Sequence, residues 1–187
     1  MRVITGKYKG RRFEIPHSFK ARPTTDFAKE NLFNVLKAYT DFEGTRVLDL
    51  FAGTGSISLE FLSRGCTQVV SVEKDYQHYC FIRSIMKKLE EEASIVLHAD
   101  ALKYIHKAQG CYDIIFADPP YMLKEMRELP DRVLNSELLL PEGIFILEHG
   151  KTQDFTEHPS FIEHREYGSV NFSFFKKTGN TDNPTHP

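Results

Sequence analysis

Short apolar runs alternate with helix-like stretches from residue 45 onward, and this alternation restricts the possible folds more than any other feature of the chain. We expect strands at 45–50, 68–72, 94–98, 112–117 and 143–148. We expect helices between them at about 56–63, 75–91, 101–107 and 122–137, the last with a possible break at Pro130. Repeated βα units build parallel sheets with right-handed crossovers. The pattern therefore predicts an α/β protein with a mostly parallel, doubly wound sheet.

The segment before this series predicts a different local structure. Residues 2–5 and 11–15 are short strand candidates joined by a turn that glycines bracket, which indicates a β-hairpin. Thr25 and Asp26 are good helix-start residues, and apolar side chains at helical spacing follow them to Tyr39. We therefore expect an N-terminal extension over 1–22 and a main domain over 23–177.

The C-terminal part is expected to add an antiparallel hairpin to the sheet. Residues 161–167 and 170–176 flank the turn residues Gly168-Ser169. Its phenylalanines are expected in the core: Phe172, Phe174 and Phe175. Residues 178–187 have no apolar anchors, so this tail is expected to be disordered.

Length and composition exclude several classes of protein. A chain of 187 residues with 41% apolar content fits one globular domain with a full core. No apolar stretch approaches the ~20 residues of a membrane helix, and the start lacks a signal-peptide core, so we expect a cytoplasmic protein without a membrane partner. A monomer is the default at this size. The three cysteines form no Cys-x-x-Cys pair and the histidines lack metal-ligand spacing, so no metal site is expected.

Basic residues are concentrated at the start of the chain, although the formal net charge of the whole is -2. Residues 1–22 contain one acidic residue and seven basic ones: Arg2, Lys7, Lys9, Arg11, Arg12, Lys20 and Arg22. A basic arm on an acidic body favours a polyanionic partner such as nucleic acid. The alternative is a solvated basic hairpin that has no partner.

A glycine-containing loop follows the first expected strand of the series, in Asp49-Leu50-Phe51-Ala52-Gly53-Thr54-Gly55. Glycines allow a tight turn and a close backbone approach to a ligand, and the next helix points its positive end at the same place. Glu73 ends the next strand and could accept hydrogen bonds from a ribose; Asp100, beside Ala101, could accept from an adenine amine. NAD-binding folds use a similar loop, but Ser58 stands where their third glycine would be. The structural alternatives are a tight turn that binds no ligand, a surface acid at Glu73 and a helix cap at Asp100.

A second site motif, Asp118-Pro119-Pro120-Tyr121, follows the fourth strand. Both motifs then lie at the carboxyl edge of one sheet, where α/β proteins bind ligands. The Asp118 carboxylate and the Pro119 carbonyl could accept both hydrogens of a planar amine, and Tyr121 could stack on the attached base. The prolines would hold these acceptors in place. An ordinary turn at the end of a strand is the alternative.

With these motifs the chain resembles class I S-adenosylmethionine-dependent methyltransferases, which have a Rossmann-like fold. Within that class it resembles the RsmD family of bacterial 16S ribosomal RNA guanine-N2 methyltransferases. The segments that carry this resemblance are Arg2-Val3-Ile4-Thr5-Gly6, Gly10-Arg11-Arg12, Arg22-Pro23-Thr24-Thr25-Asp26, Glu30 and Phe33-Asn34. It implies methylation of one guanine 2-amino group in 16S rRNA, within the small subunit or an assembly intermediate.

The resemblance also assigns roles to residues of this chain. The amine site would comprise Asp118, Pro119 and Tyr121. The S-adenosylmethionine site would comprise Asp49, Phe51, Ala52, Gly53, Gly55, Glu73, Asp100 and Ala101, bordered by Arg22 and Thr24. The RNA contacts would come from Arg2, Lys7, Lys9, Arg11 and Arg12.

Two other readings remain open from the residues. One is methylation of a different amine, either adenine N6 in nucleic acid or glutamine in a protein. The other is a ribosome-assembly factor that binds the cofactor without catalysis, although such a binder would not need the acceptor Asp118.

Overall fold

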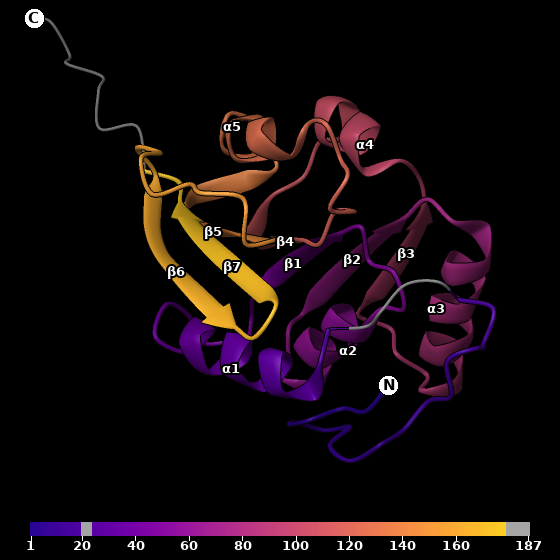
Figure 1. Cartoon of the computed structure of the whole chain (residues 1–187). Helices are drawn as coiled ribbons and strands as arrows, with labels where there is room; N and C mark the ends of the chain where they lie inside the picture. The colour runs from indigo at the N-terminus through magenta and orange to yellow at the C-terminus, as the bar shows by residue number, and fades with distance from the viewer. Residues whose placement is uncertain (20–23, 179–187) are drawn as a thin grey trace, which may run out of the picture.

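A seven-stranded mixed sheet runs through the computed structural model, which describes residues 1–19 and 24–178. The strand order is β3-β2-β1-β4-β5-β7-β6 (Figure 1). The strands are β1 (Arg46–Leu50), β2 (Gln68–Glu73), β3 (Ser94–His98), β4 (Tyr112–Ala117), β5 (Leu139–His149), β6 (Phe161–Tyr167) and β7 (Val170–Lys176). The first five pair in parallel, and β7 pairs antiparallel with β5 and β6. The predicted Rossmann-like sheet and its C-terminal hairpin are confirmed.

Helices cover both faces of this sheet, with α1 and α2 on one side and α4 and α5 on the other (Figure 1). The helical elements are α1 (Asp26–Leu36), α2 (Ser56–Ser63), α3 (Tyr76–Lys88), α4 (Ala101–Lys107), the 3-10 turn η1 (Met126–Glu128) and α5 (Leu129–Leu134). Within the described ranges, no helix is long and apolar enough to span a membrane.

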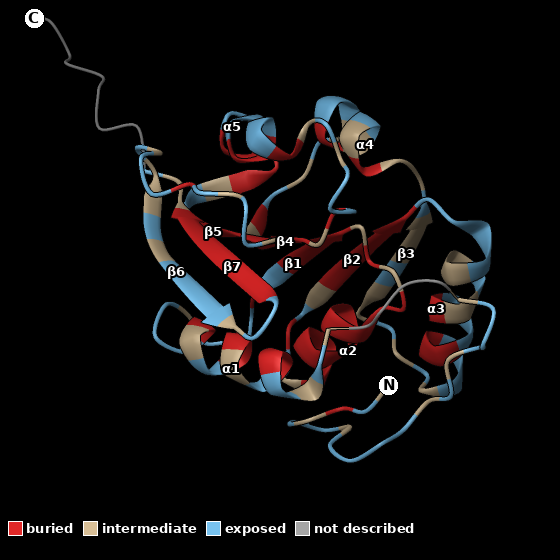
Figure 2. Cartoon of the chain, viewed as in Figure 1, coloured by how far each residue is buried: buried red, intermediate tan, exposed pale blue. Residues whose placement is uncertain are grey.

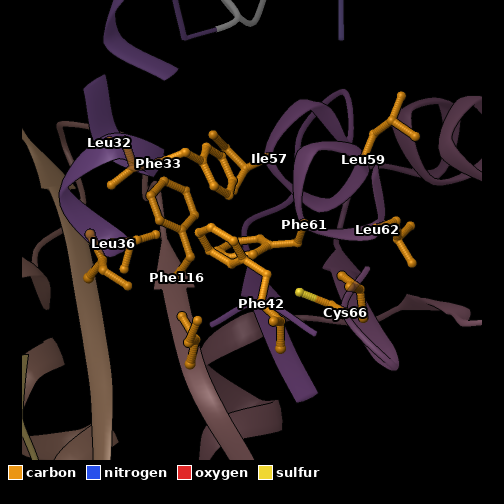
Figure 3. Packing of buried hydrophobic residues seen from close by; sticks show 14 of the residues in the cluster. Leu32, Phe33, Leu36, Phe42, Ile57, Leu59, Phe61, Leu62, Cys66 and Phe116 are labelled. Atoms are coloured by element: carbon orange, nitrogen blue, oxygen red, sulfur yellow. The ribbon is translucent and has the colours of Figure 1, made fainter. Parts of the chain in front are cut away.

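The two faces bury separate hydrophobic clusters. Aromatic rings dominate the cluster under α1 and α2, where Phe33 lies 4.7 Å from Phe61 and 5.6 Å from Phe42 between ring centroids (Figure 3). Phe116 of β4 belongs to the same cluster. The C-terminal phenylalanines are fully buried as predicted, and β7 is buried from Val170 to Phe175 whereas β6 is largely exposed (Figure 2).

The predicted helix over 122–137 is wrong. The structure has only η1 and the six-residue α5 there. Pro130 does not break a helix; it lies in the first turn of α5, where its missing N–H costs no helical hydrogen bond. The following strand begins at Leu139, four residues before the predicted start at 143, with a register shift against β4.

The N-terminal arm, residues 1–19, forms one antiparallel bridge between Arg2 and Arg12 in place of two full strands. Hydrogen bonds such as Val3 N–H to the Arg11 carbonyl, 3.0 Å, hold its two limbs together. The Lys7 N–H donates to the Ser63 carbonyl at the end of α2, 2.7 Å away. Gly6 has a φ of +90°, and a Cβ there would lie 1.7 Å from the Ser63 carbonyl oxygen. The arm therefore packs directly against the body.

A buried lysine ties the same arm to α1 and α2. Lys29 is 1% exposed, and its Nζ donates to the Arg2 carbonyl at 2.6 Å and to Glu60 at 3.3 Å. Glu60 also accepts the N–H of Ile4 and pairs with Arg64. A buried ion pair is tolerated when its remaining polar atoms are hydrogen-bonded, as they are around Lys29 and Glu60.

Candidate active site at the carboxyl edge of the sheet

A pocket opens where β1 and β4 end, next to the start of α2 and the segment before α1. Its lining residues are Thr24, Asp49, Phe51, Ala52, Gly53, Thr54, Ser56, Ile57, Phe116 and Asp118. The structure thus brings together six residues that were predicted for the two sites: Thr24, Asp49, Phe51, Ala52, Gly53 and Asp118. Gly55, Glu73, Asp100, Ala101, Pro119 and Tyr121 do not line the pocket.

The loop after β1 has an unusual backbone. Phe51, Gly53 and Gly55 have φ values of 61°, 56° and 73°. Positive φ is unfavourable for a side chain such as that of Phe51, and strained residues concentrate at binding sites. A Cβ on Gly55 would come within 3.0 Å of Ile82 in α3, so this glycine also permits close packing. The N–H of Gly55 bonds to the Ala52 carbonyl at 2.7 Å and closes the turn.

Glu73 supports this loop from the end of β2. Its Oε2 accepts the N–H of Gly53 at 2.7 Å, and its Oε1 accepts the N–H of Asp75 at 2.7 Å. The side chain is largely buried, so it is more than a surface acid. Each carboxylate oxygen has a second lone pair for a ligand hydroxyl.

Asp49 lies at the pocket floor and is 1% exposed. Its Oδ2 accepts the N–H and the hydroxyl of Ser58, and that hydroxyl also contacts the Ser71 hydroxyl at 2.7 Å. Burial raises the pKa of Asp49 to about 7, an effect that the Ser58 hydrogen bonds oppose.

Ser56, at the first turn of α2, provides a test of whether the pocket fits a polar ligand. Its hydroxyl is buried, lines the pocket and has no hydrogen-bond partner within the described residues. A buried polar atom without a partner is costly, and a bound polar group would satisfy it.

Asp100 is already engaged in hydrogen bonds and an ion pair within the protein. It is the N-cap of α4, accepting the Lys103 N–H at 3.2 Å, and it pairs with Lys74 at 2.9 Å. These contacts lower the pKa of Asp100, with the Lys74 hydrogen bond as the largest cause. Asp100 therefore caps α4, as the structural alternative expected, and only its remaining lone pairs are free to accept a hydrogen bond from a ligand.

The motif after β4 presents its residues at different depths. Pro119 is buried, whereas the Tyr121 side chain is 56% exposed and Met122 is 91% exposed. The Asp118 N–H bonds to the Leu50 carbonyl at 3.4 Å, which ties this motif to the end of β1. Burial, and next to it the charge of Glu148, raises the pKa of Asp118 well above its ordinary value.

Glu148, which sequence reasoning missed, does not line the pocket but adjoins it through the pocket residue Thr24. It lies near the end of β5, is 4% exposed and accepts a hydrogen bond from the Thr24 hydroxyl at 3.1 Å. Burial raises the pKa of Glu148 to about 7, and the Thr24 hydrogen bond opposes this shift. The available signal was an acid at the end of an apolar strand, the same signal that selected Glu73.

The predicted RNA-contacting residues are all exposed on the N-terminal arm: Arg2, Lys7, Lys9, Arg11 and Arg12. Arg2 pairs with Asp26 at 2.9 Å and Lys7 with Glu91 at 2.7 Å, so these two also hold the arm against the body. Arg22 lies outside the described residues, as does the tail from 179 onward.

The fold of the chain is that of class I methyltransferases. A structure named "Putative methyltransferase yhhF", from Escherichia coli, matches with a TM-score of 0.83 at 24% identity, covering 95% of this chain and 98% of that one. The Thermus thermophilus 16S rRNA N2 G1207 methyltransferase, solved with AdoMet and guanosine, matches with a TM-score of 0.66 at 20% identity, covering 84% of this chain and 45% of that one. At these identities the likeness shows the fold.

The chain belongs to the RsmD family, described as "Conserved hypothetical protein 95", whose pattern matches residues 1–176. A Bacillus subtilis protein named "Putative rRNA methyltransferase YlbH" is 33% identical over 186 residues, covering 96% of this chain and 100% of that protein. Ribosomal RNA small subunit methyltransferase D of Escherichia coli K12 is 28% identical over 148 residues, covering 79% of this chain and 74% of the relative. The family resemblance seen in the sequence is confirmed.

Proposed function

We propose that this protein transfers a methyl group from S-adenosylmethionine to the 2-amino group of a guanine in 16S ribosomal RNA. The observation that carries the proposal is the position of Asp118, which lines the same pocket as the loop after β1. An acceptor for an amine thus lies beside a loop suited to a nucleoside cofactor. Family membership and the names of the relatives support ribosomal RNA as the substrate.

The donor site is proposed from the pocket residues. Gly53 and Gly55 allow the cofactor to approach the backbone, and Glu73 would accept from its ribose hydroxyls. The unpartnered Ser56 hydroxyl and the N-terminal end of α2 would receive its polar amino-acid end. Asp100, Ala101, Arg22 and Thr24 complete the proposed set. When bound, S-adenosylmethionine supplies a methyl group that its positively charged sulfur has already activated.

The protein's contribution to the chemistry is then to orient the amine. The lone pair of a guanine 2-amino group is delocalised into the ring, which makes it a poor nucleophile. The Asp118 carboxylate and the Pro119 carbonyl accept its two hydrogens and favour a pyramidal nitrogen aligned with the methyl group. S-adenosylmethionine bound here would supply the methyl group to this nitrogen, which would release one proton to solvent. Tyr121 offers an exposed ring on which the base stacks.

The N-terminal arm is the proposed RNA contact. Five basic side chains are exposed on it, while the body of the chain carries an excess of acidic residues. Phosphate contacts supply most of the sequence-independent affinity for nucleic acid. We propose the small ribosomal subunit or an assembly intermediate as the substrate particle, in line with the name of the Escherichia coli relative.

Methyl transfer tests this proposal directly. Labelled S-adenosylmethionine is offered with undermethylated small subunits, free ribosomal RNA or duplex DNA, and mass spectrometry identifies the product nucleoside. The expected product is N2-methylguanosine from the subunits. N6-methyladenosine would retain the amine chemistry and refute the guanine assignment. Donor binding without transfer to any substrate would refute the proposed reaction.

Asp118→Ala tests the amine site, with a matched control near the other end of β4. We expect this variant to bind S-adenosylmethionine normally and to lose about 100-fold or more in turnover, because a charged acceptor and its positioning are lost. Asp113→Ala removes a carboxylate at the opposite end of β4, where it accepts the Arg46 N–H, and should leave turnover unchanged. Turnover of Asp118→Ala equal to that of the control would refute the assignment.

A further inference from the structure

We infer that Glu148 selects guanine over adenine by accepting the hydrogen on guanine N1, next to the amine that Asp118 holds. This inference rests on the proposed function and adds to it a specificity-determining residue on a second strand. No feature of the amine motif itself distinguishes a guanine 2-amino group from an adenine 6-amino group, since both present two hydrogens on a planar nitrogen. The distinction must come from a neighbouring contact.

The sheet register brings the two carboxylates together. β4 and β5 are parallel neighbours, with Ala117 opposite Leu147, so the next residues along the strands are Asp118 and Glu148. Side chains alternate between the faces of a strand. Phe116 and Ile146 both belong to the cluster under α1, so Asp118 and Glu148, two residues further on, project to that same face.

The side chains around Asp118 and Glu148 provide few hydrogen-bond donors to the two carboxylates. Among the residues that the structure describes, the Thr24 hydroxyl is the donor to the Glu148 carboxylate, and the Asp118 carboxylate accepts no side-chain hydrogen bond. No lysine or arginine within the described ranges pairs with either group. Glu148 is also close enough to Asp118 and Tyr121 for its charge to affect both groups. Glu148 is buried and Asp118 is partly buried, and two adjacent carboxylates in such a place are costly unless they take up a proton or a ligand brings N–H groups to them.

The Watson–Crick edge of guanine supplies these donors. It presents the N1–H beside the 2-amino group, so one carboxylate can accept from each. Adenine oriented with its 6-amino group in the same place presents the bare N1 lone pair, which the ionised form of Glu148 repels. A site built to accept a substrate N–H rejects the analogue that lacks it much more strongly than an apolar pocket does. Enzymes that act on an extruded base read this edge in such a way.

The experiment compares two substrates and four proteins. Mass spectrometry first locates the modified guanosine, and small subunits are then assembled from transcripts with guanine or adenine at that position. The proteins are the wild type, Glu148→Gln, Glu148→Asp and the control Glu166→Gln, which removes an exposed charge on β6 that pairs with Lys151. Donor affinity and melting temperature are measured for each protein, so that a folding defect is recognised.

We expect the wild type and Glu166→Gln to methylate the guanine subunits only. Glu148→Gln should lose about 10- to 100-fold in kcat/KM on guanine, and its guanine-to-adenine ratio should narrow at least tenfold, because a glutamine amide can donate to adenine N1. Glu148→Asp keeps the charge and should keep the preference for guanine even if its rate falls. A loss of guanine activity in Glu148→Gln with an unchanged ratio would mean that Glu148 only supports the fold, and would overturn the inference. Absence of N2-methylguanosine with the wild type would instead refute the proposed function.

Discussion

The contact between Gly6 and the end of α2 leads to a prediction about how the N-terminal arm is held. Gly6→Ala would place a Cβ 1.7 Å from the Ser63 carbonyl oxygen, a backbone atom that cannot rotate away. The residue also has a φ of +90°, which alanine rarely adopts. We therefore expect the arm to detach from α2. Gly10→Ala is the matched control, since Gly10 has a φ of +82° in the same turn but no atom within 4 Å of its added Cβ.

The difference between the two variants can be worked out from the contacts at Ser63. Detachment breaks three hydrogen bonds: Lys7 N–H to the Ser63 carbonyl at 2.7 Å, Tyr8 N–H to the Ser63 hydroxyl at 3.0 Å, and the Ser63 hydroxyl to the Thr5 carbonyl at 2.6 Å. At about 1 kcal/mol each, their loss amounts to roughly 3 kcal/mol. Gly10→Ala keeps these bonds and carries only the backbone strain, about 1–2 kcal/mol, which Gly6→Ala also carries.

Limited trypsin digestion measures the detached fraction, because Lys7 and Lys9 lie in the affected turn. A further 3 kcal/mol corresponds to about a 100-fold larger detached population, at 1.36 kcal/mol for each factor of ten. If the arm and the body unfold together, the same energy lowers the melting temperature of Gly6→Ala by roughly 6–12 °C more than that of Gly10→Ala. Equal digestion rates and equal melting temperatures for the two variants would refute the argument.

Two further predictions concern charge. Reversal of Arg11 and Arg12 to glutamate should weaken binding to the small subunit and flatten its salt dependence, measured by filter binding at several salt concentrations; unchanged binding would move the RNA contact elsewhere. The pKa of Asp49 is raised from 3.8 to about 7 by burial, so between these pH values the folded state keeps a proton that the unfolded state has lost. The free energy of unfolding therefore falls as the pH rises from about 4 to 7. Asp49→Asn should therefore gain in free energy of unfolding relative to the wild type between pH 5.5 and pH 8 in urea titrations; an equal difference at both pH values would contradict this.

The βα order of the fold could be predicted because periodicity and turn residues carry it. The strands β1 to β4 lie within two residues of their expected bounds, and the C-terminal hairpin matches its expected bounds. The failure at 122–137 has a local cause: apolar residues at helical spacing occur there, but they pack as a short turn and a short helix against β5. Spacing alone does not reveal how long a helix the neighbouring strand can accommodate.

The candidate site could be predicted only in part. The residues of the two loops are contiguous in the sequence, so their motifs are visible, and Asp49, Gly53 and Asp118 meet in the pocket. Glu148 carries the same local signal as Glu73, an acid at the end of an apolar strand, but its place beside Asp118 comes from the register between β4 and β5, which no local pattern encodes. The burial of Lys29 is hidden for the same reason, since it depends on an arm carbonyl 27 residues away in the chain.

The position of β7 has a consequence for the nascent chain. It is the last strand along the described chain, yet it lies inside the sheet, between β5 and β6. During synthesis the parallel strands can assemble as they emerge, while β5 keeps an open, apolar edge and β6 has no partner until β7 is available. Such an edge is a template for wrong pairing with other chains. The half of the sheet that contains Glu148 therefore completes its folding only after β7 has been made.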